Sequence, residues 1–432
     1  MSLFNRQEED GIARGERALV VLPALDGDAS LRSADARLDE AAGLAEAIGL
    51  DVVARRAFRV RQIRPATLFG KGQAEEIGEL AEGAKAGLVV VDAALTPVQQ
   101  KSLEDVTKCK VIDRTGLILE IFGERAATAE GRLQVELAHL DYQAGRLVRS
   151  WTHLERQRGG FGFLGGPGET QIEADRRMIR DRMARIRREL DQVTRTRGLH
   201  RGRRQKAPWP VIALVGYTNA GKSTLFNRLT RASVMAENLL FATLDPTMRE
   251  VKIPGFDKAI LSDTVGFVSA LPTELIAAFR ATLEEVQSAD LILHVRDLSH
   301  PDSDAQAADV AAVLTSLGLD EPGSPPRLEV WNKIDRLEAA DRAAVEAEAA
   351  RRDDVIAISA LEGWGLDALR ETVGTRLQAG AEVRQLTIAA EEGGKLAWLH
   401  ARGQVLRQQV DGANIDLAVR LSPENWARYE AL

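Results

Sequence analysis

The sequence VIALVGYTNAGKS, residues 211–223, decides the fold class of this chain of 432 residues. Its first five residues are apolar and predict a buried strand, and GYTNAGKS (216–223) follows with the GxxxxGKS spacing of a phosphate-binding loop. Glycines let backbone N–H groups converge on a phosphate, the next helix presents its N-terminus, and Lys222 reaches the β- and γ-phosphate oxygens. Phosphate is therefore expected along Gly216, Tyr217, Thr218, Asn219, Ala220, Gly221, Lys222, Ser223 and Thr224.

Two further segments supply the groups that a magnesium ion and a γ-phosphate need. Asp263 ends the predicted strand in KAILSDTVG (258–266) and is expected to hold Mg²⁺ through water, together with the Ser223 hydroxyl. The Gly266 N–H is expected to meet the γ-phosphate. In FATLDPT (241–247), Thr243 is the preferred residue to complete the Mg²⁺ shell, and Thr247 is the alternative. The expected nucleotide contacts of these segments are Phe241, Ala242, Thr243, Leu244, Asp245, Asp263, Thr264, Val265 and Gly266.

The motif Asn332-Lys333-Ile334-Asp335 predicts which base is bound. The Asp335 carboxylate can accept hydrogen bonds from guanine N1–H and N2–H₂, whereas adenine offers no donors there, and a buried unpaired carboxylate is costly. Asn332 is expected to brace the neighbouring loops, and the Lys333 stem to lie on the base. A backbone N–H in Ser359-Ala360-Leu361, after the last strand, is expected to meet guanine O6. The sequence therefore predicts GTP and GDP as ligands.

Phe267 follows Gly266 at the position where Ras-type enzymes have a glutamine that orients water. Because a phenyl ring cannot polarise water, we expect slow intrinsic hydrolysis that a partner stimulates, with Lys222, Thr243 and Gly266 as the catalytic groups. Asn219 resembles the asparagine that recruits K⁺ in some related GTPases. A hydrogen bond within the loop is the alternative explanation for Asn219.

Apolar runs that alternate with helical stretches divide the chain into domains. Residues 1–129 indicate an N-terminal α/β domain with a parallel or mixed sheet, in which Ser33 is the expected N-cap of a helix. The further ranges are a helical hairpin (130–200), a linker (201–210), a doubly wound, mostly parallel P-loop GTPase domain (211–379) and a small α+β domain (380–432). In the last domain, strands are expected over 383–390 and 415–421, around a helix over 394–409.

Apolar residues at heptad spacing predict two long helices that pair as an antiparallel coiled coil. These residues are Leu133, Leu137, Leu140, Ala144, Leu147, Trp151 and Leu154, then Ile172, Ile179, Met183, Ile186, Leu190 and Val193. Between the helices, glycines predict an irregular tip, made of Gly159, Gly160, Phe161, Gly162, Phe163, Leu164, Gly165, Gly166, Pro167 and Gly168. Phe161 and Phe163 are expected to stack on RNA bases, whereas Trp151 and Leu154 are expected in the helical core.

Charge is distributed unevenly along the chain. The whole sequence has 57 Lys+Arg and 64 Asp+Glu, yet residues 146–206 carry 17 basic and 7 acidic residues, a net charge of +10. Such a segment favours contact with a polyanion, and a solvated helix is the alternative. Cys109 is the only cysteine, which excludes an intrachain disulfide and a multi-cysteine zinc site. Because the sequence has no signal-like segment and no apolar run of membrane length, we expect a cytoplasmic protein without a membrane span.

Several of these motifs together resemble the HflX family of translational GTPases. They are FGFLGGPGETQIEADRR (161–177), GYTNAGKSTLFNRLT (216–230), FATLDPT, DTVGFV, FGKGQAEEI (69–77) and AEGRLQVELAHLDY (129–142), spread over nearly the whole chain. In that family a hydrophobic residue replaces the catalytic glutamine, as Phe267 does here. The resemblance implies a GTPase that binds the large ribosomal subunit and splits stalled or idle ribosomes, notably under heat stress. It also implies that the loop Gly159–Gly168 reaches toward the peptidyl transferase centre, and it assigns the C-terminal domain no role.

Two other functions stay open at this point. A GTP-dependent signalling switch could bind a protein partner through the coiled coil, and a helicase-like ATPase or RNA chaperone could use the same core. The basic, glycine-tipped hairpin argues against the first, and NKID (332–335) argues against the second. Family members have been suggested to hold a second nucleotide at Gly70-Lys71-Gly72, although a simple turn is the favoured explanation. We expect a monomer.

Overall fold

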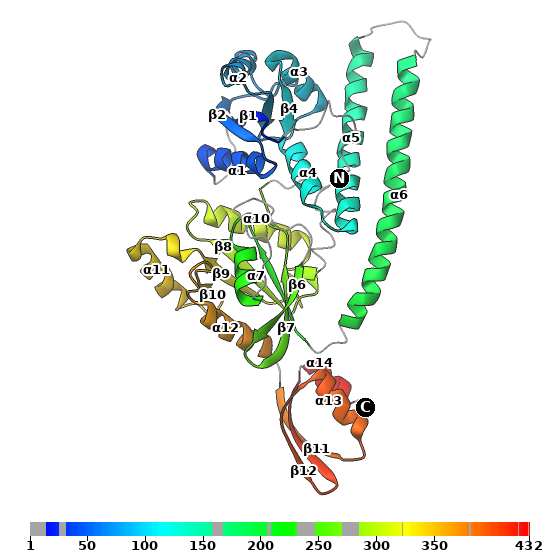
Figure 1. Cartoon of the computed structure of the whole chain (residues 1–432), viewed down its shortest axis with the longest axis vertical. Helices are drawn as coiled ribbons and strands as arrows, with labels where there is room; N and C mark the ends of the chain where they lie inside the picture. The colour runs from blue at the N-terminus through cyan, green and yellow to red at the C-terminus, as the bar shows by residue number, and fades with distance from the viewer. Residues whose placement is uncertain are drawn as a thin grey trace.

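The computed structural model describes residues 14–25, 32–157, 167–204, 209–230, 247–269, 285–321, 323–379, 382–421, 423–430 and 432. Three sheets and a pair of long helices organise these residues (Figure 1). The sheets lie within the ranges expected for the N-terminal, P-loop and C-terminal domains. None of the described helices is long and apolar enough to cross a membrane.

The N-terminal domain alternates strands and helices: β1 (Arg17–Leu25), α1 (Ala34–Ala47), β2 (Asp51–Val60), α2 (Lys71–Gly83), β3 (Leu88–Val91), α3 (Pro97–Thr107), β4 (Lys110–Asp113) and α4 (Arg114–Arg125). Its sheet is parallel, with the order β2-β1-β3-β4. Because successive strand residues face opposite sides, Val20 and Leu22 pack with α1 and α4, while Leu19 and Val21 pack with α2 and α3. Ser33 caps α1 as predicted, and its hydroxyl accepts the Ala36 N–H at 3.1 Å.

The predicted hairpin consists of α5 (Ala129–Gln157) and α6 (Pro167–Arg204), which lie side by side and antiparallel (Figure 1). The heptad positions Met183 and Ile186 are buried, and Arg182 pairs with both carboxylate oxygens of Glu136 across the helices, at 2.7 and 2.8 Å. Pro167 and Gly168 begin α6, and α6 continues to Arg204, inside the range expected as a linker. The rest of the expected tip, 158–166, lies outside the described residues.

Helix α5 has a second apolar face that the heptad pattern did not predict. Val135 and Ala138 fall between heptad positions, are each 4% exposed, and join the core formed by α1 and α4. Near them the Tyr142 hydroxyl donates to Asp113 at 2.6 Å, and Arg146 donates to the other oxygen of that carboxylate at 3.0 Å. The hairpin is therefore anchored to the N-terminal domain over residues 135–146.

The P-loop domain contains β5 (Val211–Gly216), α7 (Lys222–Thr230), β6 (Thr247–Ile253), β7 (Phe256–Asp263), β8 (Leu291–Asp297), α10 (Ser303–Ser316), β9 (Arg327–Asn332), a 3₁₀ turn η1 (Ile334–Arg336), α11 (Ala339–Ala349), β10 (Val355–Ala357) and α12 (Leu366–Gln378). Its sheet has the order β10-β9-β8-β5-β7-β6, and only β6 is antiparallel to its neighbour. Buried residues of α7 and α12 cover one face and those of α10 the other. This is the doubly wound, mostly parallel sheet that the sequence predicts.

One apolar core runs from the N-terminal domain into the P-loop domain. The buried residues Ala213 and Val215 of β5, Phe267 after β7, and Val310 and Leu314 of α10 belong to the same cluster as the buried face of α1 and α4. In Figure 1, α1 and α4 lie on the side of the N-terminal domain that faces α10. The two domains therefore share apolar packing.

The C-terminal domain corrects one expectation. It consists of β11 (Glu382–Ala389), α13 (Gly393–Arg402), β12 (Gln404–Asp411), β13 (Asn414–Leu421) and α14 (Pro423–Glu430), with an antiparallel sheet in the order β11-β13-β12. The helix expected over 394–409 is wrong in its second half, because 404–411 form a strand paired with β13. Gly403, a poor helix former, ends the helix, and pairing with β13 outweighs the helical spacing of the apolar residues that follow.

Candidate nucleotide-binding site

The loop after β5 places Lys222 at the start of α7, where the sequence expects it. Gly216 has a φ of 152°, and a Cβ there would lie 2.2 Å from the Val295 carbonyl oxygen, so only glycine fits. The Lys222 ammonium is buried and donates to the carbonyls of Gly216 and Tyr217 at 3.0 and 2.8 Å. Burial lowers the pKa of Lys222 to about 8. An anion that reaches this ammonium would offset the cost of burying its charge.

A hydroxyl and a carboxylate meet beside the loop. Ser223 Oγ donates to Asp263 Oδ2 at 2.9 Å, and Asp263 is fully buried. Both are the oxygen ligands that Mg²⁺ prefers, so the residues present fit the expected ion. Thr247 begins β6 opposite Asp263 in the register, whereas Thr243 and the rest of 241–245 lie outside the described residues. Within the described part of the chain, no three His, Cys, Asp or Glu side chains gather into another metal site.

The segment after Asp263 is hydrogen-bonded to the phosphate loop. The Thr218 N–H donates to the Phe267 carbonyl at 2.7 Å, and the Phe267 N–H donates to the Gly216 carbonyl at 3.1 Å. Gly266, the residue before Phe267, lies so close to the phosphate loop that a Cβ there would be 3.0 Å from Lys222 Nζ. Phe267 is 6% exposed and belongs to the core shared by the two domains. Its side chain is therefore buried among apolar residues and cannot orient water.

The NKID residues link the phosphate loop to the last strand. Asn332 Nδ2 donates to the Ala220 carbonyl at 2.8 Å, and Asn332 Oδ1 accepts the Ala360 N–H at 2.9 Å, the bracing expected from the sequence. Lys333 has a φ of 66° and donates to Asp297 at 2.7 Å. Asp335 Oδ1 is buried and has no hydrogen-bond partner among the residues that the structure describes. A buried acceptor without a donor is unfavourable, and guanine N1–H or N2–H would supply that donor.

The loop after β10 completes the edge of the sheet. Ser359 is fully buried, and its hydroxyl accepts the Glu362 N–H at 3.0 Å. The Ala360 N–H already donates to Asn332 Oδ1 at 2.9 Å, so it is engaged within the protein. Arg228 of α7 donates to the Ala360 carbonyl at 3.1 Å and to the Leu361 carbonyl, which fixes this loop against the helix that begins at Lys222.

Tyr217 differs from the other residues of the loop. Its backbone lies in the phosphate loop as expected, but its hydroxyl donates to Glu40 of α1 at 2.5 Å and accepts the Ser269 N–H at 2.6 Å. Sequence reasoning missed Glu40 and its partners Arg32 and Arg114. No motif or periodicity marks them, because they come from another domain.

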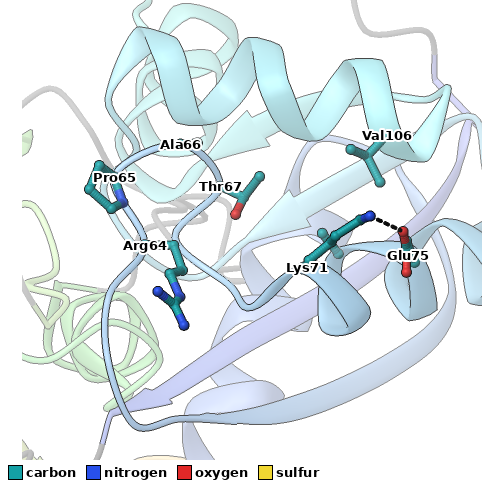
Figure 2. Close-up of a pocket in the computed structure, with 8 residues that line it drawn as sticks. Arg64, Pro65, Ala66, Thr67, Lys71, Glu75 and Val106 are labelled. Carbon is teal, nitrogen blue, oxygen red and sulfur yellow. Dashed lines mark ion pairs between the residues drawn. The ribbon is translucent and has the colours of Figure 1, made fainter.

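A second candidate site lies in the N-terminal domain, next to α2 (Figure 2). The cavity measures about 410 Å³ and is lined by Arg64, Pro65, Ala66, Thr67, Lys71, Ala74, Glu75 and Val106. The Gly70 N–H at the start of α2 donates to Gln73 Oε1 at 2.9 Å, and Lys71 points toward Glu75, with 3.9 Å between the charged atoms. These groups have partners within the helix, which supports the simpler explanation of Gly70-Lys71-Gly72 as a helix start.

A phosphate loop, a hydroxyl–carboxylate pair and an NKID loop all lie at the carboxyl edge of one parallel sheet, where ligands of such folds bind. This combination defines a GTPase of the P-loop class. The chain is 48% identical to the GTPase HflX of Magnetococcus marinus over 95% of its own length and 94% of the relative's. It is 40% identical to the GTPase HflX of Escherichia coli, over 96% and 95% of the two chains. It therefore belongs to the HflX family of GTPases.

Family models cover most of the chain in four consecutive pieces. Residues 35–123 match a GTP-binding GTPase N-terminal domain, and residues 125–204 match a GTP-binding GTPase middle region. Residues 211–333 match a 50S ribosome-binding GTPase, and residues 344–430 match an HflX C-terminal domain. The last match begins within α11 and includes α12, and both helices belong to the P-loop domain in the structure.

Proposed function

We propose that this GTPase binds the large ribosomal subunit in the cytoplasm and splits stalled or idle ribosomes in a nucleotide-dependent manner, notably under heat stress. The model matched by residues 211–333, which describes ribosome-binding GTPases, supports the choice of partner. GTP sets the affinity for the subunit, and the tip of the hairpin, Gly159–Gly168, converts binding into displacement of the other subunit.

The observation that carries this proposal is a row of arginines on α6. They are exposed, and none forms an ion pair with any residue that the structure describes; they are Arg177, Arg180, Arg185, Arg187 and Arg188. Elsewhere in the hairpin, Arg182 pairs with Glu136. Guanidinium groups without carboxylate partners are suited to bind the phosphates of ribosomal RNA. A helix that only had to be solvated would not need the excess of 17 basic over 7 acidic residues that residues 146–206 carry.

At the nucleotide site we propose GTP with Mg²⁺, held by Ser223 and Thr243 and, through water, by Asp263. The ion would neutralise the charge of the β- and γ-phosphates. Lys222 and the Gly266 N–H would bind the γ-phosphate oxygens, and Phe267 would leave the orientation of water to the ribosome. We also propose K⁺ at Asn219, which is exposed, has a φ of 58°, and forms no side-chain hydrogen bond within the described residues.

Co-sedimentation through a sucrose gradient tests the proposal. With a non-hydrolysable GTP analogue, the protein should migrate with the large subunit, and added intact ribosomes should separate into subunits. With GDP, most of the protein should stay at the top of the gradient. Protein that stays at the top with either nucleotide would overturn ribosome binding and favour the protein-binding switch.

A further inference from the structure

A buried polar cluster connects the N-terminal domain to two segments of the nucleotide site. At its centre is Glu40 of α1, whose side chain is 11% exposed. Its Oε2 accepts the Tyr217 hydroxyl at 2.5 Å and Arg32 Nη1 at 2.8 Å. Its Oε1 accepts the Ser269 hydroxyl at 2.8 Å and a guanidinium N–H of Arg114. Each carboxylate oxygen therefore binds one cation and one hydroxyl of the P-loop domain.

Ion pairs of both signs extend the cluster. Arg114 also binds Asp92 at 2.5 Å, Arg32 binds Asp309 of α10 at 2.6 Å, and Arg37 lies 3.6 Å from Asp92. In these contacts three guanidinium groups face three carboxylates, and the most deeply buried of them, Arg32, Arg114, Glu40 and Asp92, carry opposite charges in equal number. Burial would raise the pKa of Glu40, but the attraction of Arg114 and the hydrogen bonds from Tyr217 and Arg114 lower it to about 2. Burial raises the pKa of Tyr217, so its hydroxyl keeps its proton and stays a donor.

The two hydroxyls come from the segments that frame the γ-phosphate position. Tyr217 is the second residue of the phosphate loop, and its carbonyl accepts Lys222 Nζ. Ser269 lies two residues beyond Phe267, its N–H donates to the Tyr217 hydroxyl at 2.6 Å, and its carbonyl accepts Arg114 at 3.0 Å. Gly266, three residues before Ser269, lies against the Lys222 ammonium. The cluster thus holds the Ser269 end of the segment that carries the Gly266 N–H, and through Tyr217 it holds the phosphate loop beside that segment.

We propose that Glu40 is a positioning residue for the GTPase site: from the N-terminal domain it holds Tyr217 and Ser269 so that Gly266 stays against Lys222, ready for a γ-phosphate. A triphosphate that binds the Gly266 N–H strengthens this arrangement, whereas a diphosphate does not reach it. Coupling of this kind is reciprocal, so the triphosphate also tightens the contact between the two domains by the same factor. This coupling between nucleotide binding and the contact of the two domains is separate from ribosome binding, and it is measured without ribosomes.

Tyr217→Phe is the sharpest variant for a test. It keeps the aromatic ring that Arg32 covers at 5.0 Å and the carbonyl that binds Lys222. It removes the hydroxyl's bonds to Glu40 and to the Ser269 N–H, and also the bond that Arg32 Nη1 donates to this hydroxyl at 2.9 Å. Ser269→Ala removes the second hydroxyl and is the independent variant. Tyr142→Phe is the matched control, because the Tyr142 hydroxyl is also bonded to a carboxylate and an arginine, but entirely within the N-terminal domain and the hairpin.

Two measurements on the full-length protein decide the proposal. Affinity for a non-hydrolysable GTP analogue should fall about tenfold in Tyr217→Phe and in Ser269→Ala, while affinity for GDP changes less than about twofold. In the wild type, the amides of α1 should exchange hydrogen more slowly with the GTP analogue than with GDP, and both variants should abolish that difference. Tyr142→Phe should retain both wild-type properties.

A purely structural role would give a different pattern. If Tyr217→Phe weakened both nucleotides equally, or kept the full preference for the triphosphate, Glu40 would hold the domains together without positioning Gly266. Exchange of α1 that is the same with both nucleotides in the wild type would also overturn the proposal. None of these results bears on ribosome binding, which the gradient experiment tests separately.

Discussion

A single buried oxygen, Asp335 Oδ1, carries the choice of base. Replacing Asp335 with Asn exchanges an acceptor for a donor, which should weaken GTP roughly tenfold to hundredfold and favour xanthosine triphosphate, whose C2 carbonyl is an acceptor. Competition against a fluorescent guanine nucleotide measures the affinities of the variant for GTP and for xanthosine triphosphate. Asp341→Asn, an exposed position on α11, should bind like the wild type. An Asp335→Asn protein that still prefers GTP would show that the base lies elsewhere.

Substitutions of Phe267 test whether a glutamine at this position would orient the attacking water. Because its side chain is 6% exposed in the shared core, Phe267→Gln should lower the free energy of unfolding by about 2–4 kcal/mol and should not raise intrinsic hydrolysis. Urea denaturation and single-turnover hydrolysis give the two quantities. Phe267→Leu, which stays apolar, should lose less stability. Faster hydrolysis by the glutamine variant would mean that position 267 faces the phosphate after all.

The sequence predicts the residues of the nucleotide site better than their partners. Spacing alone brings Lys222, Ser223, Asp263 and Asn332 to one edge of a sheet, because each follows a strand or opens a helix in a known pattern. Glu40 lies 177 residues before Tyr217 and 229 before Ser269, and neither contact belongs to a local pattern. Such contacts are fixed by how two domains pack, which a single sequence does not reveal.

Among the elements, helix α6 carries the expected contact with RNA. Replacing Arg180 and Arg188 with Gln should reduce the slope of log affinity against log salt by roughly 0.7–0.9 for each phosphate that the variant no longer neutralises. Ribosome binding at several salt concentrations provides the slope. The control variant Arg351→Gln/Arg428→Gln removes two exposed arginines of other domains and should leave the slope of log affinity against log salt unchanged. A salt-independent affinity in the wild type would contradict RNA contact and favour a protein partner.

The tip of the hairpin should separate binding from splitting. Replacing residues 159–166 with a short Gly-Ser turn keeps Pro167 and Gly168 at the start of α6. GTP affinity should be nearly unchanged, ribosome splitting should fall sharply, and ribosome-stimulated hydrolysis should fall less, because the helices still dock. Light scattering measures ribosome splitting, and a GTPase assay on the same variant measures hydrolysis, so the two losses can be compared. Normal ribosome splitting by this variant would show that the glycine-rich tip only joins the two helices.

Helices and strands with strong local patterns are predicted well, and the exceptions have physical causes. Heptad spacing finds both helices of the hairpin, yet it misses the face of α5 that carries Val135 and Ala138, because that face packs on another element. The strand β12 is mistaken for the end of a helix, because its few apolar residues do not alternate and only pairing with β13 makes it a strand. In each case tertiary packing selects among structures that the local sequence allows.

For the whole molecule, the ionised Glu40 makes the domain contact sensitive to acid. Its pKa falls from an ordinary 4.5 to about 2 in the folded protein, so it stabilises the fold fully above about pH 4.5, and this contribution is lost as the pH falls toward 2. The thermal midpoint of Glu40→Gln should lie below that of the wild type by a constant amount at neutral pH, and the gap should narrow below about pH 4.5. Glu46→Gln, exposed on the same helix, should follow the wild type. A gap that is independent of pH would contradict this.

The continuous core has a consequence for how the chain is made. A ribosome synthesises the N-terminal domain first, but the apolar face of α1 and α4 packs with Phe267, Val310 and Leu314, which emerge much later. At roughly 5–20 residues per second, the interval between the end of α4 and the end of α10 is on the order of 10–40 s. For that time the nascent N-terminal domain exposes apolar surface that the finished molecule covers. The risk of aggregation is therefore set by this interval during synthesis, and a chaperone that covers α1 and α4 would be most useful before residue 314 has left the exit tunnel.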